Sequence, residues 1–555
     1  MTRASRTARA FTWRLLWAAA LVAGCGGRAS YWSSPIASSP PTFNLGDEIA
    51  LVDTGADRVV LLTAGANQSL TTTVIPVGAN ILNAAASPDG AKLFVVSGGH
   101  RAQLGDDQPN EWPSITVIAA GAQSARYDLT NITDPLAGLA IDPAGHWVVL
   151  YPGSGTNQPF VENPNELVIL DVSRPPPIVA VPHTLMSFGG HPQRFTFIPS
   201  LAVPTGPYPL LIVESDQGLS VLRLDDPSKP EITVPLTNGS DTQLLSPAGI
   251  AVYPGDAMTG AGACIGVRLA NDDDVVALQF VPNVDASGNS VGNGFLPTVN
   301  LNDVGGIASD IAFVNTDSGL RLAALVPGAS KATLIDPVTS LTQDVALPAP
   351  YQNLSVVTGA LGSASGCDGA TTSTAVPTDV ALLWNGTTVQ GQEGVAFWEL
   401  GQAGCQPYRS IATVGVMDVV AAVLDVPTPN ATLKVLQTRD ADAFYILNLA
   451  NRTAAPLETS SSNIALSISP LGDQVWSYVP SGLTVFATDF AHELPRSLLI
   501  ERPVFGVYEI ARTGMGPAVV VLHDEGGVGA TVYDATTLDD STRRLYAGLL
   551  LGGAP

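Results

Sequence analysis

The sequence predicts an all-β fold, and three observations carry that prediction. Runs that alternate apolar and polar residues return at intervals of roughly 40 to 60 residues, as the strands of a repeated module do. The chain contains 54 Gly and 43 Pro spread over its length, which is typical of short strands joined by turns. After the first 24 residues, no stretch keeps helical apolar spacing for three turns. A small sheet cannot bury both of its faces alone, so we expect the modules to pack radially as a β-propeller.

The first 24 residues predict a secretory signal peptide. They carry four arginines (Arg3, Arg6, Arg9 and Arg14), followed by an apolar run over residues 15–23. This run is shorter than the roughly 20 apolar residues that a membrane-spanning helix needs. Residues 22–25 read Val-Ala-Gly-Cys and resemble the bacterial lipobox, which implies cleavage between Gly24 and Cys25 and lipidation of Cys25. An ordinary signal peptide with a chance cysteine is the alternative.

Residues 25–46 predict a flexible tether, because they are rich in Gly, Ser and Pro. The lipobox resemblance implies more than one acyl chain on Cys25, and two or more chains hold a protein stably on a membrane. We therefore expect a lipid-anchored protein of the bacterial cell envelope. Its placement in the outer membrane rests on analogy, and the sequence does not choose between the periplasmic face and the cell surface.

The clearest copy of the repeat covers residues 84–119. An alternating strand leads through Ser-Pro-Asp-Gly to the run LFVV and, after a loop, to SITVIAA. Proline fixes its own φ and glycine accepts a positive one, so Ser-Pro-Asp-Gly predicts a tight turn. Further copies occur at residues 138–153 with 166–172, 210–230, 309–328, 463–489 and 517–537. The phrases LFVVSGG and SITVIAAG resemble the YVTN-type and WD-like propeller repeats, which implies that each copy is part of a blade.

The number of blades is harder to predict. Nine or ten partial copies can be counted, but insertions at residues 99–113, 254–263 and 283–297 blur their edges. We expect seven or eight blades in a single ring over residues 47–552. In this interpretation the N-terminal strands EIALVDT and RVVLLTA complete the last blade. An array of β-sandwiches is the alternative, because it would also consist of short strands and turns.

The charge balance argues against a nucleic-acid partner. The formal net charge of the full chain is −24, and removal of the signal peptide with its four arginines leaves 21 basic against 49 acidic residues, a net charge of −28. Such a surface repels phosphate backbones. Because 46% of the residues are hydrophobic and only 13% are charged, the chain is expected to fold around a large core.

Three cysteines remain beyond Cys25. Cys367 and Cys405 both lie in Gly-flanked loop sequence, and an exported chain reaches an oxidising compartment in which a disulfide persists. We prefer this pair, although three cysteines allow three single bridges and the sequence does not exclude the other two. Cys264 opens the apolar run CIGVRLA and is expected to be a buried thiol.

The candidates for a metal site are few. His523 and Asp524 follow the apolar run AVVVL, at the end of a predicted strand near which a propeller lines its central channel. Asp285 opens a loop rich in short oxygen-bearing side chains, which suit Ca²⁺, but its glycines do not fall where an EF-hand loop needs one. The triplet 272–274 (Asp-Asp-Asp) predicts a solvated hairpin tip, with a calcium site as the alternative. Since each candidate also fits a surface turn, we expect no cofactor, and Ca²⁺ is the alternative.

No catalytic motif stands out. The pattern G-x-S-x-G occurs once, at residues 288–292, but both of its flanks are loop-like, whereas a nucleophile elbow needs a strand before the serine and a helix after it. We therefore predict a non-catalytic binding or scaffold module for a protein or glycan of the envelope. The alternative is a propeller enzyme of the lactonase or quinoprotein sort, with a metal or cofactor in the central channel.

Overall fold

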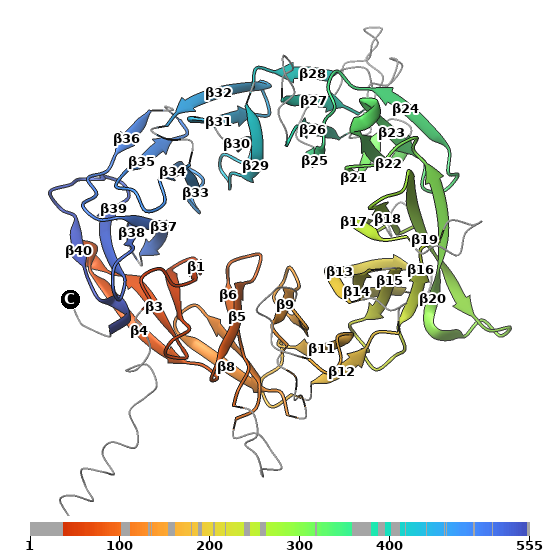
Figure 1. The fold of residues 1–555 in the computed structure, drawn as a ribbon, viewed down its shortest axis with the longest axis horizontal. Helices are drawn as coiled ribbons and strands as arrows, with labels where there is room; N and C mark the ends of the chain where they lie inside the picture. Colours follow the sequence, from red (N-terminus) through yellow and green to blue (C-terminus); the bar gives the residue numbers. More distant parts are fainter. Residues whose placement is uncertain are drawn as a thin grey trace, which may run out of the picture.

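The computed structural model shows one closed ring of β-sheets (Figure 1). The structure describes residues 37–551 except the segments 101–110, 154–160, 187–190, 204–205, 238–244, 256–261, 317–318, 358–378, 387–393, 401–410 and 492–493 and the single positions 131, 133, 135, 179, 217, 417, 440, 460, 462 and 513. The described residues form ten antiparallel sheets of four strands each. We number these sheets as blades 1 to 10 in chain order.

Each blade consists of four strands that are consecutive in the chain. Blade 1 contains β1 (Thr42–Asn44), β2 (Glu48–Asp53), β3 (Arg58–Ala64) and β4 (Leu70–Pro76). Blade 2 contains β5 (Ile81–Ala86), β6 (Lys92–Ser97), β7 (Ser114–Ala119) and β8 (Gln123–Asp128). Blade 3 contains β9 (Gly138–Ile141), β10 (Trp147–Tyr151), β11 (Glu166–Asp171) and β12 (Val181–Thr184). Blade 4 contains β13 (Pro192–Val203), β14 (Gly206–Ser215), β15 (Gly218–Arg223) and β16 (Ile232–Pro235). Blade 5 contains β17 (Pro247–Tyr253), β18 (Cys264–Leu269), β19 (Asp274–Val284) and β20 (Ser290–Asp303).

The second half of the ring repeats this order. Blade 6 contains β21 (Asp310–Thr316), β22 (Gly319–Val326), β23 (Lys331–Ile335) and β24 (Thr342–Ala346). Blade 7 contains β25 (Asn353–Val357), β26 (Val380–Trp384), β27 (Val395–Glu399) and β28 (Ile411–Val414). Blade 8 contains β29 (Val419–Asp425), β30 (Leu433–Arg439), β31 (Ala443–Asn448) and β32 (Thr453–Glu458). Blade 9 contains β33 (Ala465–Ile468), β34 (Gln474–Tyr478), β35 (Val485–Asp489) and β36 (Pro495–Ser497). Blade 10 contains β37 (Val504–Arg512), β38 (Met515–His523), β39 (Gly529–Asp534) and β40 (Arg544–Tyr546).

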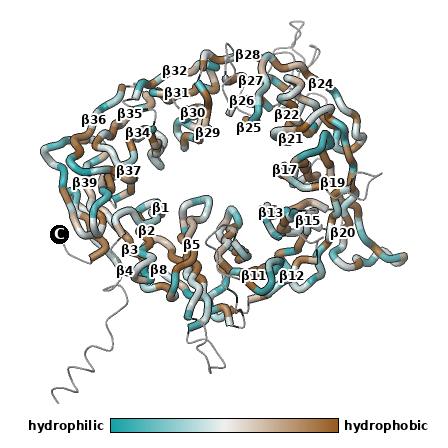
Figure 2. Tube along the Cα trace, in the orientation of Figure 1, coloured by the Kyte–Doolittle hydropathy of each residue, from teal (hydrophilic) through white to brown (hydrophobic). Residues whose placement is uncertain are grey.

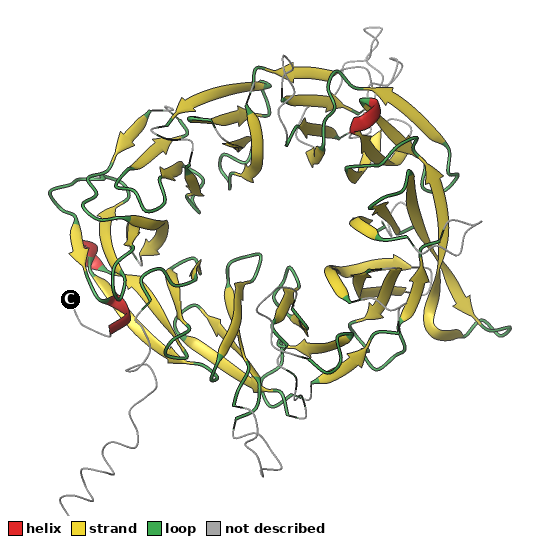
Figure 3. Ribbon diagram, viewed as in Figure 1, coloured by secondary structure: helices red, strands yellow, loops and turns green. Residues whose placement is uncertain are grey.

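Helical structure is confined to single turns in the described part of the chain (Figure 3). These are the 3₁₀ turns η2 (Ala66–Gln68), η3 (Pro327–Ala329) and η4 (Leu549–Leu551). Among the described residues, no helix is long and apolar enough to span a membrane. The first strand of a blade lies towards the middle of the ring, as β9, β17 and β25 show, and the fourth lies at the outer edge (Figure 1).

The predicted number of seven or eight blades is wrong, because the ring has ten. The strands EIALVDT and RVVLLTA do not complete the last blade. They form β2 and β3, which pair with their own neighbours β1 and β4 to make a complete first blade. The first strand begins at Thr42, so the propeller includes the last residues of the stretch that we assigned to the tether.

The predicted tight turns connect first and second strands in several blades. In blade 2 the amide of Gly90 donates to the carbonyl of Ser87 (2.8 Å), and in blade 9 Gly472 donates to Ser469 in the same way (2.9 Å). Both glycines adopt a positive φ, 68° and 66° respectively, which residues with a side chain rarely adopt. The turn sequence therefore sets where these first strands end.

Strand β6 shows how a blade buries both of its faces. Leu93, Phe94, Val95 and Val96 are all at most 2% exposed. Leu93 and Val95 pack in a cluster with blade 1, whereas Phe94 and Val96 pack in a cluster with blade 3. Successive side chains of a strand point to opposite faces, so each apolar run fills two interfaces at once. Apolar residues recur in every blade around the ring (Figure 2).

Blades 10 and 1 meet at a seam that holds the ring closed. There β37 packs against β2 and β3, and apolar residues of both blades share one buried cluster. The Tyr546 hydroxyl accepts a hydrogen bond from the Leu70 amide (3.0 Å) and donates one to the Gln68 carbonyl (2.9 Å). The Arg58 guanidinium donates to the Leu550 carbonyl. The seam is thus closed by side-chain packing and hydrogen bonds between two sheets, each of which is complete in itself.

Candidate functional site

The predicted metal candidates lie in two distant parts of the ring. His523 ends β38 in blade 10 and is 1% exposed; its Nε2 lies 2.6 Å from the Thr531 hydroxyl, and its Nδ1 has no hydrogen-bond partner among the described residues. Burial lowers the pKa of this imidazole. Asp524 follows it, and its amide donates to the Pro503 carbonyl (2.9 Å). Asp285 lies in blade 5, so the structure does not bring the three residues together.

Asp285 occupies the tip of the hairpin that joins β19 and β20. Its carboxylate accepts hydrogen bonds from the backbone amide (2.9 Å) and side-chain amide (3.2 Å) of Asn289 and from the Ser287 amide (2.8 Å), and these bonds lower its pKa. The residues 288–292 of the G-x-S-x-G pattern belong to the same hairpin, and Ser290 is the first residue of β20. This turn between two strands is not a nucleophile elbow.

The acidic triplet 272–274 lies where β18 leads into β19, with Asp274 as the first residue of β19, so it occupies the predicted hairpin tip. One carboxylate oxygen from each aspartate lies within 4.8 Å of the others. Burial and the charges of Asp272, Asp273 and Asp303 raise the pKa of Asp274. Clusters of acidic side chains near the surface are common, so the triplet by itself identifies no site.

The cysteines divide between described and undescribed residues. Cys264 is 3% exposed and unpaired, so the predicted buried thiol is confirmed. Burial raises its pKa to about 12, which makes the thiolate, the reactive form, rare at neutral pH. Cys25, Cys367 and Cys405 lie outside the described residues, and the lipidation and disulfide predictions stay predictions.

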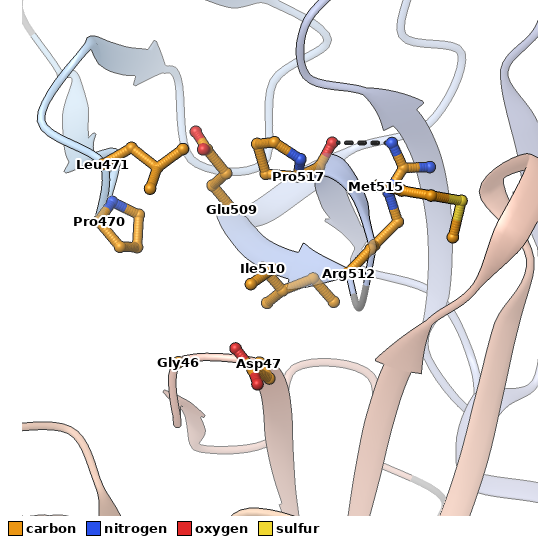
Figure 4. A pocket seen from close by; sticks show the side chains of 10 residues that line it. Gly46, Asp47, Pro470, Leu471, Glu509, Ile510, Arg512, Met515 and Pro517 are labelled. Atoms are coloured by element: carbon orange, nitrogen blue, oxygen red, sulfur yellow. Dashed lines mark hydrogen bonds between the residues drawn. The ribbon is translucent and has the colours of Figure 1, made fainter.

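A cavity at the seam gathers polar groups that the sequence candidates do not include. It has a volume of about 240 Å³ and opens where blades 9, 10 and 1 meet (Figure 4). We call it the Glu509 cavity. Its lining comes from the β1–β2 turn, the β33–β34 turn and the strands β37 and β38: Gly46, Asp47, Pro470, Leu471, Glu509, Ile510, Ala511, Arg512, Met515 and Pro517.

Glu509 is the buried acid of this cavity. It is 3% exposed, and its Oε2 has no hydrogen-bond partner among the described residues. Its backbone carbonyl accepts a hydrogen bond from Asn44 Nδ2 of blade 1 (3.3 Å), which fixes β37 against the seam. Burial raises the pKa of the carboxyl to about 7; the Ser469 hydroxyl and the Trp476 indole oppose this shift, and the Asp473 charge adds to it. The Glu509 carboxyl therefore titrates closer to neutral pH than an exposed glutamate does.

Arg512 also lines the cavity, but its guanidinium is already paired with a carboxylate of the protein. Its Nη2 donates to the Asp534 carboxylate (2.5 Å) and the Pro517 carbonyl (3.1 Å), and its Nε donates to the Gly516 carbonyl (2.5 Å). The arginine side chain is 3% exposed. Arg512 therefore supports the β37–β38 turn and leaves Glu509 without a cationic partner.

The second acid of the cavity comes from blade 1. Asp47 is exposed, in the β1–β2 turn, and Figure 4 shows its carboxylate and that of Glu509 on opposite sides of the cavity. Leu471 (51% exposed) and Met515 (45% exposed) are the large exposed hydrophobic residues of the lining. The cavity thus combines apolar walls with two carboxylates.

Sequence reasoning missed Glu509, although a signal was present. The residue lies within the apolar stretch VFGVYEIAR, where a strand alternates its faces. A carboxylate inside such a stretch, in phase with the buried Val507, predicts a buried acid, and buried acids are uncommon without a partner. The convergence of Asp47 and Leu471 on it depends on ring closure, and local sequence does not reveal that.

A second buried glutamate provides a comparison. Glu214 on β14 is also 3% exposed, its Oε2 also lacks a hydrogen-bond partner among the described residues, and burial raises its pKa. However, Arg194 lies 3.7 Å from that oxygen, and the charge of Arg268 also acts on it. Glu214 is therefore balanced by arginines of its own, whereas Glu509 is not.

Comparisons with known proteins do not assign a family. No protein-family model matches the sequence, and no curated protein sequence matches it. Among solved structures, dihydro-heme d1 dehydrogenase NirN in complex with DHE is similar at 11% identity and a TM-score of 0.38, over 86% of this chain and 81% of that one. Apo AztD from Citrobacter koseri gives 10% identity and a TM-score of 0.30, over 75% and 96%. A streptogramin B lyase is similar at 12% identity and a TM-score of 0.26, over 58% of this chain and 87% of that one. The strand order and pairing of the chain itself identify it as a ten-bladed β-propeller.

Proposed function

We propose that this protein is a lipid-anchored binding protein of the bacterial cell envelope and that its ligand occupies the Glu509 cavity. One observation carries the proposal: a carboxyl oxygen of a side chain that is 3% exposed, lining a cavity, has no hydrogen-bond partner among the described residues. Buried polar atoms almost always have a partner in folded proteins. A ligand that donates a hydrogen bond would supply it.

The size of the cavity limits the ligand. At about 240 Å³ it is smaller than the pockets of roughly 300 to 1,000 Å³ that hold drug-sized ligands. It suits a small molecule or a single projecting group of a larger partner. The protein or glycan partner that the sequence predicts is therefore proposed to insert one end group here.

Filling the cavity tests the proposal. Leu471→Trp puts a bulky ring in the lining, and Leu471 is exposed enough to accept it without disturbing the core. The full-length protein, purified from membranes and analysed by native mass spectrometry, should carry a bound compound that the variant lacks. Leu483→Trp is the matched control, because Leu483 is similarly exposed (54%) in blade 9 but does not line the cavity.

Two results would refute this proposed function. One is the same bound compound at the same occupancy in the wild type and in Leu471→Trp. The other is a wild-type protein that carries no compound, even after incubation with an envelope extract.

The anchor is tested separately. Replacing Cys25 by Ser removes the thiol that would be acylated, so the variant should leave the membrane fraction and appear in the soluble fraction. Continued sedimentation of Cys25→Ser with lipid would contradict the lipid anchor without affecting the cavity.

A propeller enzyme is the second candidate, and the pKa of Glu509 favours it. A carboxyl with a pKa of about 7 can exchange protons at neutral pH, as a general acid or base does. The compound recovered from the wild type should be incubated with wild type and with Glu509→Gln at pH 7. Conversion by the wild type alone would favour the enzyme, and unchanged compound in both would favour binding.

A further inference from the structure

We infer that the ligand group in the Glu509 cavity is an organic ammonium on an apolar stem. This inference rests on the proposed function and specifies its ligand class. The charges of the lining carry it. Asp47 and Glu509 contribute two carboxylates, and the only cation in the lining, Arg512, is paired with Asp534. The cavity therefore attracts a positive group and repels an anion.

The hydrogen-bonding groups point the same way. Glu509 Oε2 needs a donor, and an ammonium group has three donors and no acceptor. A hydrogen bond between an ammonium and a carboxylate is charge-assisted, and it is stronger than one between neutral groups. The Ser469 hydroxyl and the Trp476 indole lie near the carboxyl and favour its ionised form, but neither makes a hydrogen bond to Oε2, which stays open to a donor from the ligand.

The walls explain why the cation should be organic. Pro470, Leu471, Ile510, Met515 and Pro517 present carbon and sulfur surface, which an alkyl stem covers and a hydrated metal ion does not. Calcium needs six to eight oxygen ligands. Within the residues that the structure describes, the only trio of possible ligand atoms within 4.8 Å of one another is at residues 272–274, far from this cavity.

Binding should depend on pH through Glu509. The groups that face its carboxyl are Asp473 and Ser469 from the β33–β34 turn, the Trp476 indole from β34 and, across the cavity, Asp47 from blade 1. The charge of Arg512 is held by Asp534. The ammonium binds the ionised carboxylate. Protonation below a pKa of about 7 removes that charge, so affinity should be about tenfold lower at pH 6 than at pH 8.

The test uses n-butylammonium as a free amine and a blocked lysine tripeptide as a protein-borne amine, with butan-1-ol as the neutral analogue. Dissociation constants are measured by ligand-observed NMR titration on the full-length protein. Glu509→Gln should weaken n-butylammonium about ten- to a hundredfold. Asp47→Asn, at an exposed position, should weaken it by less than about fivefold. Glu214→Gln is the matched control with the same burial and should leave the constant unchanged.

Each outcome decides something. Tighter binding of the tripeptide than of the free amine would identify a lysine side chain of a partner as the source of the group, and the reverse would identify a free amine. Equal affinity for butan-1-ol and n-butylammonium, or undiminished binding to Glu509→Gln and Asp47→Asn, would overturn the inference. If n-butylammonium fails to bind while Leu471→Trp still loses the native compound, the ammonium inference fails and the proposed function stands.

Discussion

At the scale of single residues, Glu509 links ring stability to pH. Its pKa rises from 4.5 in the unfolded chain to about 7 in the folded one. Between these two pH values the folded state holds a proton that the unfolded state has released. The stability that this proton contributes is complete below about pH 4.5 and is lost as the pH rises through about 7. A shift of this size corresponds to about 3 kcal/mol.

Glu509→Gln should therefore gain stability relative to the wild type as the pH rises from 4.5 to 8. Urea unfolding at several pH values, followed by tryptophan fluorescence, measures the difference. Val507→Ala on the same strand removes buried carbon without a titrating group, so it should lower stability equally at every pH. If the free energies of unfolding of the wild type and of Glu509→Gln changed in parallel with pH, the assigned burial of this carboxyl would be contradicted.

Cys264 allows a second test at this scale. A buried thiol with a pKa of about 12 should react with iodoacetamide only after unfolding. Peptide mass spectrometry of the alkylated protein, native and denatured, reports each cysteine separately. The same spectra test the predicted Cys367–Cys405 bridge, because a disulfide-linked peptide pair would appear before reduction. Rapid native alkylation of Cys264 would show that β18 is open to solvent.

At the scale of elements, the outermost strand of blade 5 differs from the other nine. It spans 14 residues, whereas the fourth strands of the other blades span three to seven. Val281 (40% exposed) and Leu296 (45% exposed) are directly paired across the β19–β20 hairpin. Natural proteins usually keep exposed edge strands short, because an open edge pairs with other chains.

Leu296→Lys should slow self-association of the protein. A charge on the edge strand opposes strand addition, while the loss of an exposed side chain should change folding stability by less than about 0.5 kcal/mol. Light scattering below the melting temperature measures the effect. Leu499→Lys is the control, since Leu499 is equally exposed (50%) but lies outside any strand. Equal scattering by both variants would show that β20 is not the associating edge.

The strands themselves were largely predictable, whereas their grouping was not. Runs such as LFVV are buried on both faces as predicted, and the Ser-Pro-Asp-Gly turn forms where it was expected. Blade boundaries carry no such signal. Residues 77–80 join two blades, while the much longer stretch of residues 98–113 joins two strands of one blade. Connection length therefore misled the blade count, and the short β1 with the threonine-rich β4 hid the first blade.

At the scale of the whole molecule, the seam differs from the other interfaces because its two blades, 1 and 10, are not consecutive in the chain. Neighbouring blades elsewhere follow each other in the chain, but blades 1 and 10 are held by contacts alone. Tyr546→Phe leaves the Leu70 amide without its acceptor, which should cost about 1 to 3 kcal/mol and open the seam first. Hydrogen exchange should then rise in blades 1 and 10 before the other blades.

Tyr127→Phe is the matched control for the seam. The Tyr127 hydroxyl donates to the Arg174 carbonyl (2.8 Å) and so joins blades 2 and 3, which are also joined by the chain. Loss of this hydrogen bond should raise hydrogen exchange only in blades 2 and 3. Uniformly raised exchange in Tyr546→Phe would show that the ring unfolds as one unit rather than from the seam.

The candidate site marks the limit of prediction from sequence, because it exists only when the ring closes. Glu509 could be recognised as an acid in an apolar strand, but Asp47 and Leu471 reach it from positions 462 and 38 residues away in the chain. Long-range convergence of this kind follows from the number and curvature of blades, which no local pattern fixes.

The continuity of each blade in the chain also has an evolutionary consequence. A gene segment that encodes four consecutive strands can be duplicated or lost as a unit, and every remaining sheet keeps all of its pairings. Ring size can then change by one unit per event, with only the curvature of the remaining interfaces left to adjust. Related genes that differ in length by about one such segment should therefore encode rings of nine or eleven blades, and any of them that keeps the junction between its first and last sheets would also keep the cavity.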